Sequence, residues 1–498
     1  MPDPENGGYP EQTQSLCPAC LARIPAERVR RGGDVFLVKR CPEHGEFETP
    51  VWRGTPDFDA WMRPKTPSHP KAPAAPLRDG CPFDCGLCPD HGQHTCTLLV
   101  EVTGRCNLHC PVCFASSGER PAADPSLADV RTLLHDQIAL GGPCNLQLSG
   151  GEPTVREDLP EIVALAKAAG FPFVQLNTNG LRLAETPGYA AALAQAGLDS
   201  VFLQCDGVSD AAYLALRGRA LARTKLAAIE NAGKARLGTV LTATVRPGVN
   251  HGELGDLIRL AVSRSPAVRG VHFQPMSHFG RYPGSSDQAT APPHASRITL
   301  PEIIRLLHEQ TDGAVSPAHF NPPGCEHALC SFSGKYLVMP DASLKPLSSA
   351  GRCSCAPGGM PGGMPDRTSG GTFGGDAERD SPPSAAEGAA RAKALTARDW
   401  AAPQRQAPSP APPAVPDRPR DDLDRFLERA QTHILTVSAM AFMDAWTLDL
   451  DRLKGCCIHV AGPDGRRVPF CAYNLTAADG TPLYRGRGFP GKPKDGAA

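Results

Sequence analysis

The sequence predicts an α/β protein built around a partial parallel (β/α)6 barrel, with a metal-binding ribbon before it and a cysteine-bearing region after it. Three observations support this prediction. Apolar β-type runs alternate with Ala/Leu-rich helical stretches from Leu98 to Gln274. Cysteines gather in tight groups on both sides of that region. A Gly/Pro-rich stretch interrupts the chain at residues 356–420.

The composition fits a globular protein of roughly two to three domains. Of the 498 residues, 41% are apolar, and the net charge of −1 does not favour a nucleic-acid binder. The N-terminus lacks the features of a signal peptide, and no apolar stretch is long enough to span a membrane. We therefore expect a cytoplasmic protein, in which the 19 cysteines are metal ligands, catalytic thiols or buried residues rather than disulfides.

Residues 15–52 are expected to form the metal-binding ribbon. Cys17 and Cys20 form one pair of ligands, and Cys41 and His44 form the other. The residues between the pairs allow a two-strand ribbon in which VFLV is one strand. Thiolates and an imidazole suit tetrahedral zinc or a mononuclear, rubredoxin-like iron. The alternative is a cysteine-containing ribbon without a metal.

Residues 53–97 combine a Pro-rich linker with a second group of cysteines. Cys81, Cys85 and Cys88 have C-x3-C-x2-C spacing, and Cys96 or a distant cysteine is expected as the fourth ligand. This spacing predicts a 4Fe–4S cluster.

Residues 98–300 are expected to form the barrel. The predicted strands are TLLVEV, NLQLS, FVQLN, SVFLQ, TVLTATV and VRGVHFQ. The predicted helices include LADVRTLLHDQIAL, LPEIVALAKAAG and YAAALAQAG. Repeated strand–helix units favour a parallel barrel whose ligand site lies at the C-terminal ends of the strands.

The loop after the first of these strands carries the central motif. Cys106, Cys110 and Cys113 repeat the C-x3-C-x2-C spacing. Three thiolates from one loop can hold three irons of a 4Fe–4S cluster and leave the fourth iron open. The alternative is a structural zinc site in which His109 is the fourth ligand.

Polar residues and glycines follow the later strands, where a barrel presents its ligand face. These residues are Gly150, Gly151, Glu152, Asn177, Asn179, Gln204, Asp206 and Gln274. Together with the cysteine loop and Phe114 after it, they make the sequence resemble the radical SAM superfamily.

The resemblance implies that the cysteine loop holds a 4Fe–4S cluster whose open iron binds S-adenosylmethionine (SAM). Gly150, Gly151 and Glu152 would bind the amino group of SAM. The polar residues after the third and fourth strands would bind its carboxylate or ribose, and Gln274 would approach the adenine. Reductive cleavage would give a 5′-deoxyadenosyl radical, with an electron donor such as flavodoxin or ferredoxin.

The C-terminal half divides into an extension at 301–355, a disordered Gly/Pro-rich insert at 356–420 and a cysteine-containing segment at 421–498. A second auxiliary cluster is expected, with Cys325, Cys330, Cys457 and Cys471 as ligands. Cys456 is the alternative to Cys457 in this group, and whichever of the two binds no metal is expected to be a packing residue. Cys353 and Cys355 receive no role. Cys144 and Cys205 stand alone and are expected to be buried.

Three segments support a closer resemblance: the N-terminal CPAC…CPEHG, the run from Cys81 to Ala115, and the tail CCIHVAGPDGRRVPFCAYN. They look like a radical SAM subfamily that contains the archaeal tetraether lipid synthase and 7,8-dihydro-6-hydroxymethylpterin methyltransferases. This resemblance implies one or two auxiliary 4Fe–4S clusters and C–C bond formation, by alkyl coupling or methylation, on a lipid or pterin. A lipid substrate would bring contact with a membrane surface.

Two other functions remain open at this stage. The chain could mature a peptide or natural product by the same radical chemistry. It could instead be a non-catalytic iron–sulfur scaffold for electron transfer, which would bind clusters without cleaving SAM.

Replacing Cys110 with alanine removes one of the three thiolates of the central motif. We expect this variant to lose 5′-deoxyadenosine production while the N-terminal ribbon keeps its metal, because the two sites share no ligand. Chromatography of the reaction and metal analysis of the protein check both outcomes. Continued SAM cleavage by Cys110→Ala would contradict the assignment.

Overall fold

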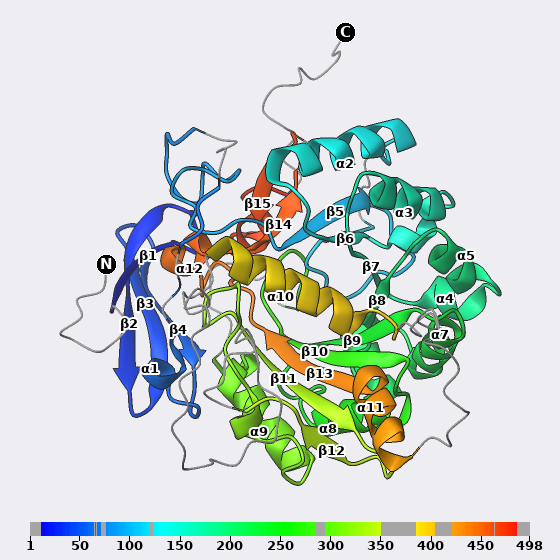
Figure 1. The fold of residues 1–498 in the computed structure, drawn as a ribbon. Coiled ribbons are helices and arrows are strands. Elements are labelled where there is room, and N and C mark those ends of the chain that lie inside the picture. The colour runs from blue at the N-terminus through cyan, green and yellow to red at the C-terminus, as the bar shows by residue number, and fades with distance from the viewer. Residues whose placement is uncertain are drawn as a thin grey trace, which may run out of the picture.

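The computed structural model describes residues 11–63, 65, 67–70, 76–118, 123–283, 294–349, 385–403, 421–462 and 464–485. These residues form a four-stranded antiparallel sheet and a mixed sheet of eleven strands (Figure 1). None of the described helices is long and apolar enough to cross a membrane.

The N-terminal sheet has four strands, where the sequence predicted two. They are β1 (Gln12–Leu16), β2 (Arg23–Arg31), β3 (Asp34–Cys41) and β4 (Gly45–Trp52), followed by the short helix α1 (Phe58–Trp61). Every second side chain of β3 is buried, including Val35 and Leu37. This alternation places one face of the sheet against the rest of the protein.

The six predicted barrel strands are confirmed. They are β5 (Thr97–Thr103), β6 (Asn145–Gly150), β7 (Val174–Thr178), β8 (Ser200–Gln204), β9 (Gly238–Val245) and β10 (Val268–Pro275). Each strand pairs in parallel with the next one along the chain. Their apolar residues form the main core, in which Cys144 and Cys205 are fully buried as expected.

Helices cover the outside of these strands, and the three predicted segments are among them. They are α2 (Leu127–Gly141), α3 (Leu159–Ala168), α4 (Leu181–Glu185), α5 (Tyr189–Gln195), α6 (Asp210–Arg217), α7 (Ala222–Lys234) and α8 (Leu254–Ser263). Helix α2 begins at a capping box in which Ser126 and Asp129 satisfy each other's backbone N–H groups.

The C-terminal half extends the barrel sheet at both edges, which the sequence analysis did not predict. Strand β13 (Ile434–Met440) pairs in parallel with β10, and β14 (Ile458–Ala461) pairs in parallel with β5. The antiparallel strands β11 (Ser331–Val338), β12 (Leu344–Pro346) and β15 (Arg467–Pro469) complete the two edges.

The other helical elements are α9 (Leu300–Gln310), α10 (Ala385–Trp400), α11 (Asp422–Thr432), α12 (Leu450–Lys454), α13 (Phe470–Asn474), and the single turns η1 (Pro153–Val155), η2 (His294–Ser296) and η3 (Pro317–His319). Helix α10 corrects the prediction of disorder for the whole of 356–420. This helix packs against β9, β10 and β13, and Figure 1 draws it in yellow. Residues 351–384, which include Cys353 and Cys355, lie outside the described part of the chain.

Buried charged groups join the N-terminal sheet to the C-terminal segment. The guanidinium of Arg28 donates to the Asp449 carboxylate over 2.9 Å, and both side chains are at most 5% exposed. The ammonium of Lys39 donates to Ser15 Oγ and to the carbonyl oxygens of Leu16 and Ala445. Buried charges are tolerated only when they are paired in this way, so these contacts fix the two ends of the chain together.

Replacing Arg28 with methionine leaves the buried Asp449 carboxylate without its cation, and we expect the free energy of unfolding to fall by about 3 kcal/mol. Urea titration measures this change. Arg31→Met is the matched control: its ion pair with Glu48 is exposed, so stability should stay nearly unchanged. An equal decrease in the free energy of unfolding in the two variants would show that the buried ion pair contributes no more to stability than the exposed one.

Candidate functional site

The three cysteines of the central motif lie on the loop after β5, at the C-terminal ends of the barrel strands. Cys110 is buried, Cys106 and Cys113 are half-buried, and all three line a cavity of about 420 Å³. Burial raises the pKa of the Cys106 thiol to about 12, and it also raises the pKa of Cys110. A bound metal would have to displace these protons, which a cluster of irons does readily. His109 is exposed, and among the described residues neither it nor the three cysteines belong to a group whose ligand atoms all lie within 4.8 Å of one another.

The Gly150–Glu152 segment is held against the entrance of the cysteine loop by backbone hydrogen bonds. The N–H of Gly151 donates to the Thr103 carbonyl, and the N–H of Glu152 donates to the Arg105 carbonyl, each over 2.8 Å. A Cβ at either glycine would collide with those same carbonyl oxygens, and Gly150 has φ +128°. The two glycines are therefore required by the close approach of two protein segments.

The Glu152 carboxylate is 2% exposed and organises the end of β7. One oxygen accepts hydrogen bonds from the N–H and hydroxyl of Thr154 and from the Thr178 hydroxyl. The other accepts from the N–H of Asn179 over 2.7 Å. The Asn179 side chain in turn donates to Asn107 inside the cysteine loop. Asn107, which the sequence analysis missed, thus links the two motifs.

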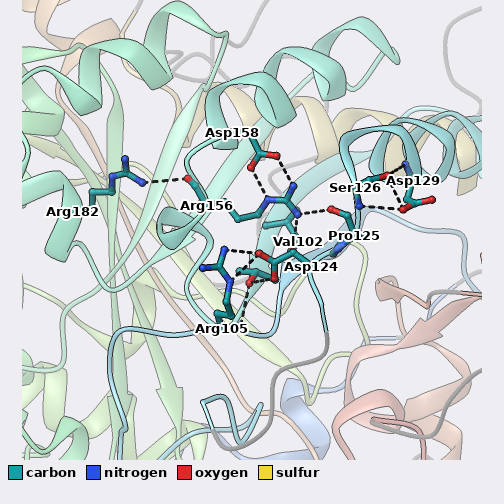
Figure 2. Close-up of polar contacts among 10 residues, drawn as sticks. Val102, Arg105, Asp124, Pro125, Ser126, Asp129, Arg156, Asp158 and Arg182 are labelled. Carbon is teal, nitrogen blue, oxygen red and sulfur yellow. Dashed lines mark hydrogen bonds and ion pairs between the residues drawn. The ribbon is translucent and has the colours of Figure 1, made fainter.

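An arginine network fixes the same two segments from outside, as Figure 2 shows. Arg156 donates to the Val102 carbonyl of β5 over 2.9 Å and forms a two-point ion pair with Asp158. Arg105, directly before Cys106, pairs with Asp124. The chain on both sides of the cavity is therefore anchored before any ligand binds.

Asp206 differs from its expected role as a cofactor contact. It is fully buried, it does not line the cavity, and its carboxylate accepts two hydrogen bonds from Arg217. Arg217 lines the cavity and donates to the Val112 carbonyl in the cysteine loop over 3.0 Å. Asp206 therefore positions Arg217, a residue of α6 that no sequence motif had marked.

Asn177, Gln204, Gln274 and Phe114 do line the cavity, in agreement with their expected placement. The side-chain oxygens of Asn177 and Gln204 are buried without a hydrogen-bond partner among the described residues. Such groups cost free energy unless a ligand or water satisfies them. Their position beside the cysteine loop fits the expected SAM site.

The cavity has two parts of different polarity. Around the cysteine loop its walls are apolar, with Leu108, Val112, Phe114, Met276, Phe279 and Phe470. Inside the barrel, polar side chains from six strands line the cavity: Gln147, Asn177, Gln204, Thr242, His272, Thr436 and Ser438. We call this polar part the lumen.

The ribbon brings together the four predicted ligands Cys17, Cys20, Cys41 and His44, whose ligand atoms all lie within 4.8 Å of one another. The His44 ring nitrogen is 3.4 Å from Cys41 Sγ, and this contact lowers the pKa of Cys41 to about 6. The arrangement fits a tetrahedral metal ion.

The structure groups the cysteines expected to hold auxiliary clusters differently from the sequence prediction. Cys96 lies with Cys325 and Cys457, and their sulfur atoms are within 4.8 Å of one another. The N–H of Cys96 donates to the Cys457 carbonyl over 2.8 Å, because β14 pairs with β5 at this point. All three line the cavity, at the end opposite the central motif. We call them the Cys96 trio.

The remaining cysteines form two further groups. Cys81, Cys85 and Cys88 surround a small pocket away from the barrel cavity. Cys330 lies near Cys456 and Cys471, and Arg452 donates to its sulfur over 3.5 Å. Cys456, the alternative to Cys457 in the expected second auxiliary group, is therefore the member of that pair that lies near Cys330 and Cys471.

Comparisons with known proteins match this arrangement. Residues 9–53 match the HMPTM N-terminal zinc ribbon domain, and residues 100–261 match the radical SAM superfamily. The chain is 34% identical, over 495 residues that cover 93% of each protein, to the 7,8-dihydro-6-hydroxymethylpterin dimethyltransferase of Methanocaldococcus jannaschii.

More distant similarities involve only parts of the chain. A probable GTP 3′,8-cyclase of Methanothermobacter thermautotrophicus is 33% identical over 180 residues, which are 36% of this chain and 58% of that protein. The solved structure of SuiB from Streptococcus suis aligns with 44% of this chain and 46% of its own, with a TM-score of 0.36 and 14% identity. The near-complete match to the pterin enzyme places the chain in its family: the protein belongs to the radical SAM superfamily, whose members bind a 4Fe–4S cluster and SAM.

Proposed function

We propose that the chain is a radical SAM methyltransferase that acts on a reduced pterin, with Cys106, Cys110 and Cys113 as the ligands of the SAM cluster. When bound and reduced, this cluster supplies the electron that cleaves SAM into methionine and a 5′-deoxyadenosyl radical. The protein provides three thiolates on one anchored loop, an apolar wall that excludes water, and hydrogen-bonding groups that orient SAM.

Different residues of the chain hold the cysteine loop in place and bind SAM. Glu152 holds the end of β7 in place, and its carboxylate faces the cavity beside the cysteine loop. Asn177 and Gln204 present unpaired acceptors to the same space. Arg217 fixes the loop backbone through Val112 and adds a positive charge near Cys110. These groups bind and orient SAM.

The polar lumen is the observation that favours a pterin over a lipid. Two buried hydroxyls that line it and are not assigned to SAM, those of Thr242 and Thr436, have no hydrogen-bond partner among the described residues. An isoprenoid chain would leave these groups unpaired, at a cost of about 1–3 kcal/mol for each. A pterin carries ring nitrogens, an amino group and a carbonyl that can pair with them.

The size of the cavity also bears on the alternative of peptide maturation. A volume of about 420 Å³ suits a small molecule beside SAM. It leaves little room for a peptide segment, and the dimethyltransferase relative, which matches 93% of the chain, acts on a pterin.

The cysteine groups would hold the further metals. We propose that the Cys96 trio binds an auxiliary 4Fe–4S cluster at the end of the substrate cavity. Cys81, Cys85 and Cys88 supply ligands to another, and the ribbon binds zinc or a rubredoxin-like iron. Electrons would come from an external donor of the flavodoxin or ferredoxin class.

The regrouping of Cys96 can be tested by combining substitutions. If Cys96 and Cys325 serve one cluster, the double variant to alanine should lose no more iron and sulfide than either single variant. Cys96→Ala combined with Cys85→Ala should lose the iron of two clusters. Iron and sulfide per reconstituted chain are the measured quantities. The opposite result would contradict the regrouping. In that case the iron losses would add up in the Cys96 and Cys325 double variant, and the Cys96 and Cys85 double variant would lose no more iron than either single variant.

The substrate can be tested in a strain of the source organism that lacks the gene. We expect its extracts to lose methylated pterins and to keep their lipids unchanged, as measured by mass spectrometry. Complementation with the wild-type gene should restore the pterins, and complementation with Cys110→Ala should not. Loss of coupled lipid chains with unchanged pterins would contradict the proposal.

A further inference from the structure

Helix α10 closes the end of the barrel that lies opposite the cysteine loop. Asn145, the first residue of β6, donates from its side chain to the Lys393 carbonyl over 3.3 Å. Arg269, near the start of β10, donates to the Asp399 carbonyl over 3.1 Å. Lys335 of β11 pairs with the Asp399 carboxylate over 2.6 Å. Because Asn145 and Arg269 stand at the N-terminal ends of two parallel strands, α10 covers the N-terminal mouth (Figure 1).

The backbone at the end of α10 is seated directly on the barrel. A Cβ at Gly238, the first residue of β9, would collide with the carbonyl oxygen of Trp400 and the backbone of Ala401 and Ala402. Only glycine permits this approach. The Trp400 side chain is therefore held at a fixed place over the mouth.

The Trp400 indole reaches two aromatic rings inside the barrel. Its ring centroid is 5.7 Å from that of Phe202 on β8 and 6.4 Å from that of His272 on β10. Burial lowers the pKa of His272 to about 4, so its ring is neutral at neutral pH, and its Nδ1 lies 2.9 Å from Ser438 Oγ. All three rings line the cavity. They form an uncharged aromatic floor beneath the lumen.

Unpaired polar atoms stand beside this floor. The Thr242 and Thr436 hydroxyls are buried, line the cavity and have no partner among the described residues. A flat ring that carries hydrogen-bonding atoms at its edge can satisfy both features, because its face stacks on aromatic side chains while its edge pairs with the hydroxyls.

We propose that Trp400 is a substrate-contacting specificity residue, on which a planar heteroaromatic substrate stacks with its edge toward the Thr242 and Thr436 hydroxyls. This inference rests on the proposed function, which places a reduced pterin in the lumen. It assigns a binding role to a residue of the insert, where the sequence predicted only disorder.

The test measures binding of 7,8-dihydro-6-hydroxymethylpterin to the reconstituted, SAM-loaded full chain without a reductant, so that no turnover occurs. Isothermal titration calorimetry compares the wild type with Trp400→Leu, which keeps an apolar side chain but loses the flat ring. Affinity should fall about tenfold in Trp400→Leu, since stacking on an aromatic side chain typically contributes a factor of this order. Trp400→Phe should stay within about threefold of the wild type.

Two controls separate a contact from a general disturbance. Arg391→Ala changes an exposed residue of the same helix that does not line the cavity, and its pterin affinity should equal that of the wild type. Iron content and SAM affinity should be unchanged in all variants. If Trp400→Leu also loses iron, tryptophan fluorescence provides the test instead. Pterin should quench the fluorescence of the wild type more strongly than that of Trp400→Phe, because the indole of Trp400 is in contact with the pterin.

The outcomes distinguish this inference from the proposed function. Equal pterin affinity in the wild type and a correctly loaded Trp400→Leu, or equal quenching in the wild type and Trp400→Phe, overturns the role of Trp400 alone. A wild-type protein that binds SAM but no pterin overturns the proposed substrate and this inference with it.

Discussion

The backbone pairing of Gly150–Glu152 with Thr103–Arg105 is the constraint on which the rest of the site depends. It holds the segment expected to bind SAM against the first residues of the cysteine loop, and only glycine fits at the two contacts. The Glu152 carboxylate then ties this segment to the end of β7. Three strand ends are thereby fixed around one cavity, and the cysteine loop that lines it is held further by hydrogen bonds from Arg217 and Asn179.

The second organising feature is the return of the C-terminal chain to the barrel. Strand β14 pairs with β5, and β13 pairs with β10. The first pairing brings Cys457 to Cys96, and Cys325 completes the group. One cavity therefore has the cysteine loop at one end and a second thiol group at the other. A substrate in the lumen would lie between them.

Local patterns in the sequence predicted the six barrel strands, the cysteine loop and the ligands of the ribbon. Each of these depends on residues close together in the chain, such as Cys106 to Cys113. The membership of the auxiliary groups could not be predicted, because Cys96 meets Cys457 only through a strand pairing more than three hundred residues apart. Asp206 was predicted to contact a ligand because it follows a barrel strand. Nothing in its local sequence indicates the ion pair with Arg217.

The insert shows that composition alone also has limited power to predict local structure. Gly and Pro dominate much of 356–420, yet the Ala-rich stretch that forms α10 is compatible with a helix once Gly238 and Arg269 provide a seat for it. Tertiary contacts of this kind leave no signal in a local window. Here they place Trp400 at the mouth of the lumen, opposite the cysteine loop.

The central claim is that SAM and a pterin share one cavity, with the pterin in the polar lumen between the cysteine loop and α10. An anaerobic crystal structure of the reconstituted chain with SAM and 7,8-dihydro-6-hydroxymethylpterin tests it most directly. The account predicts pterin density against Trp400, with hydrogen bonds to Thr242 or Thr436. A pterin bound outside the barrel, with the lumen filled by ordered water, would contradict it.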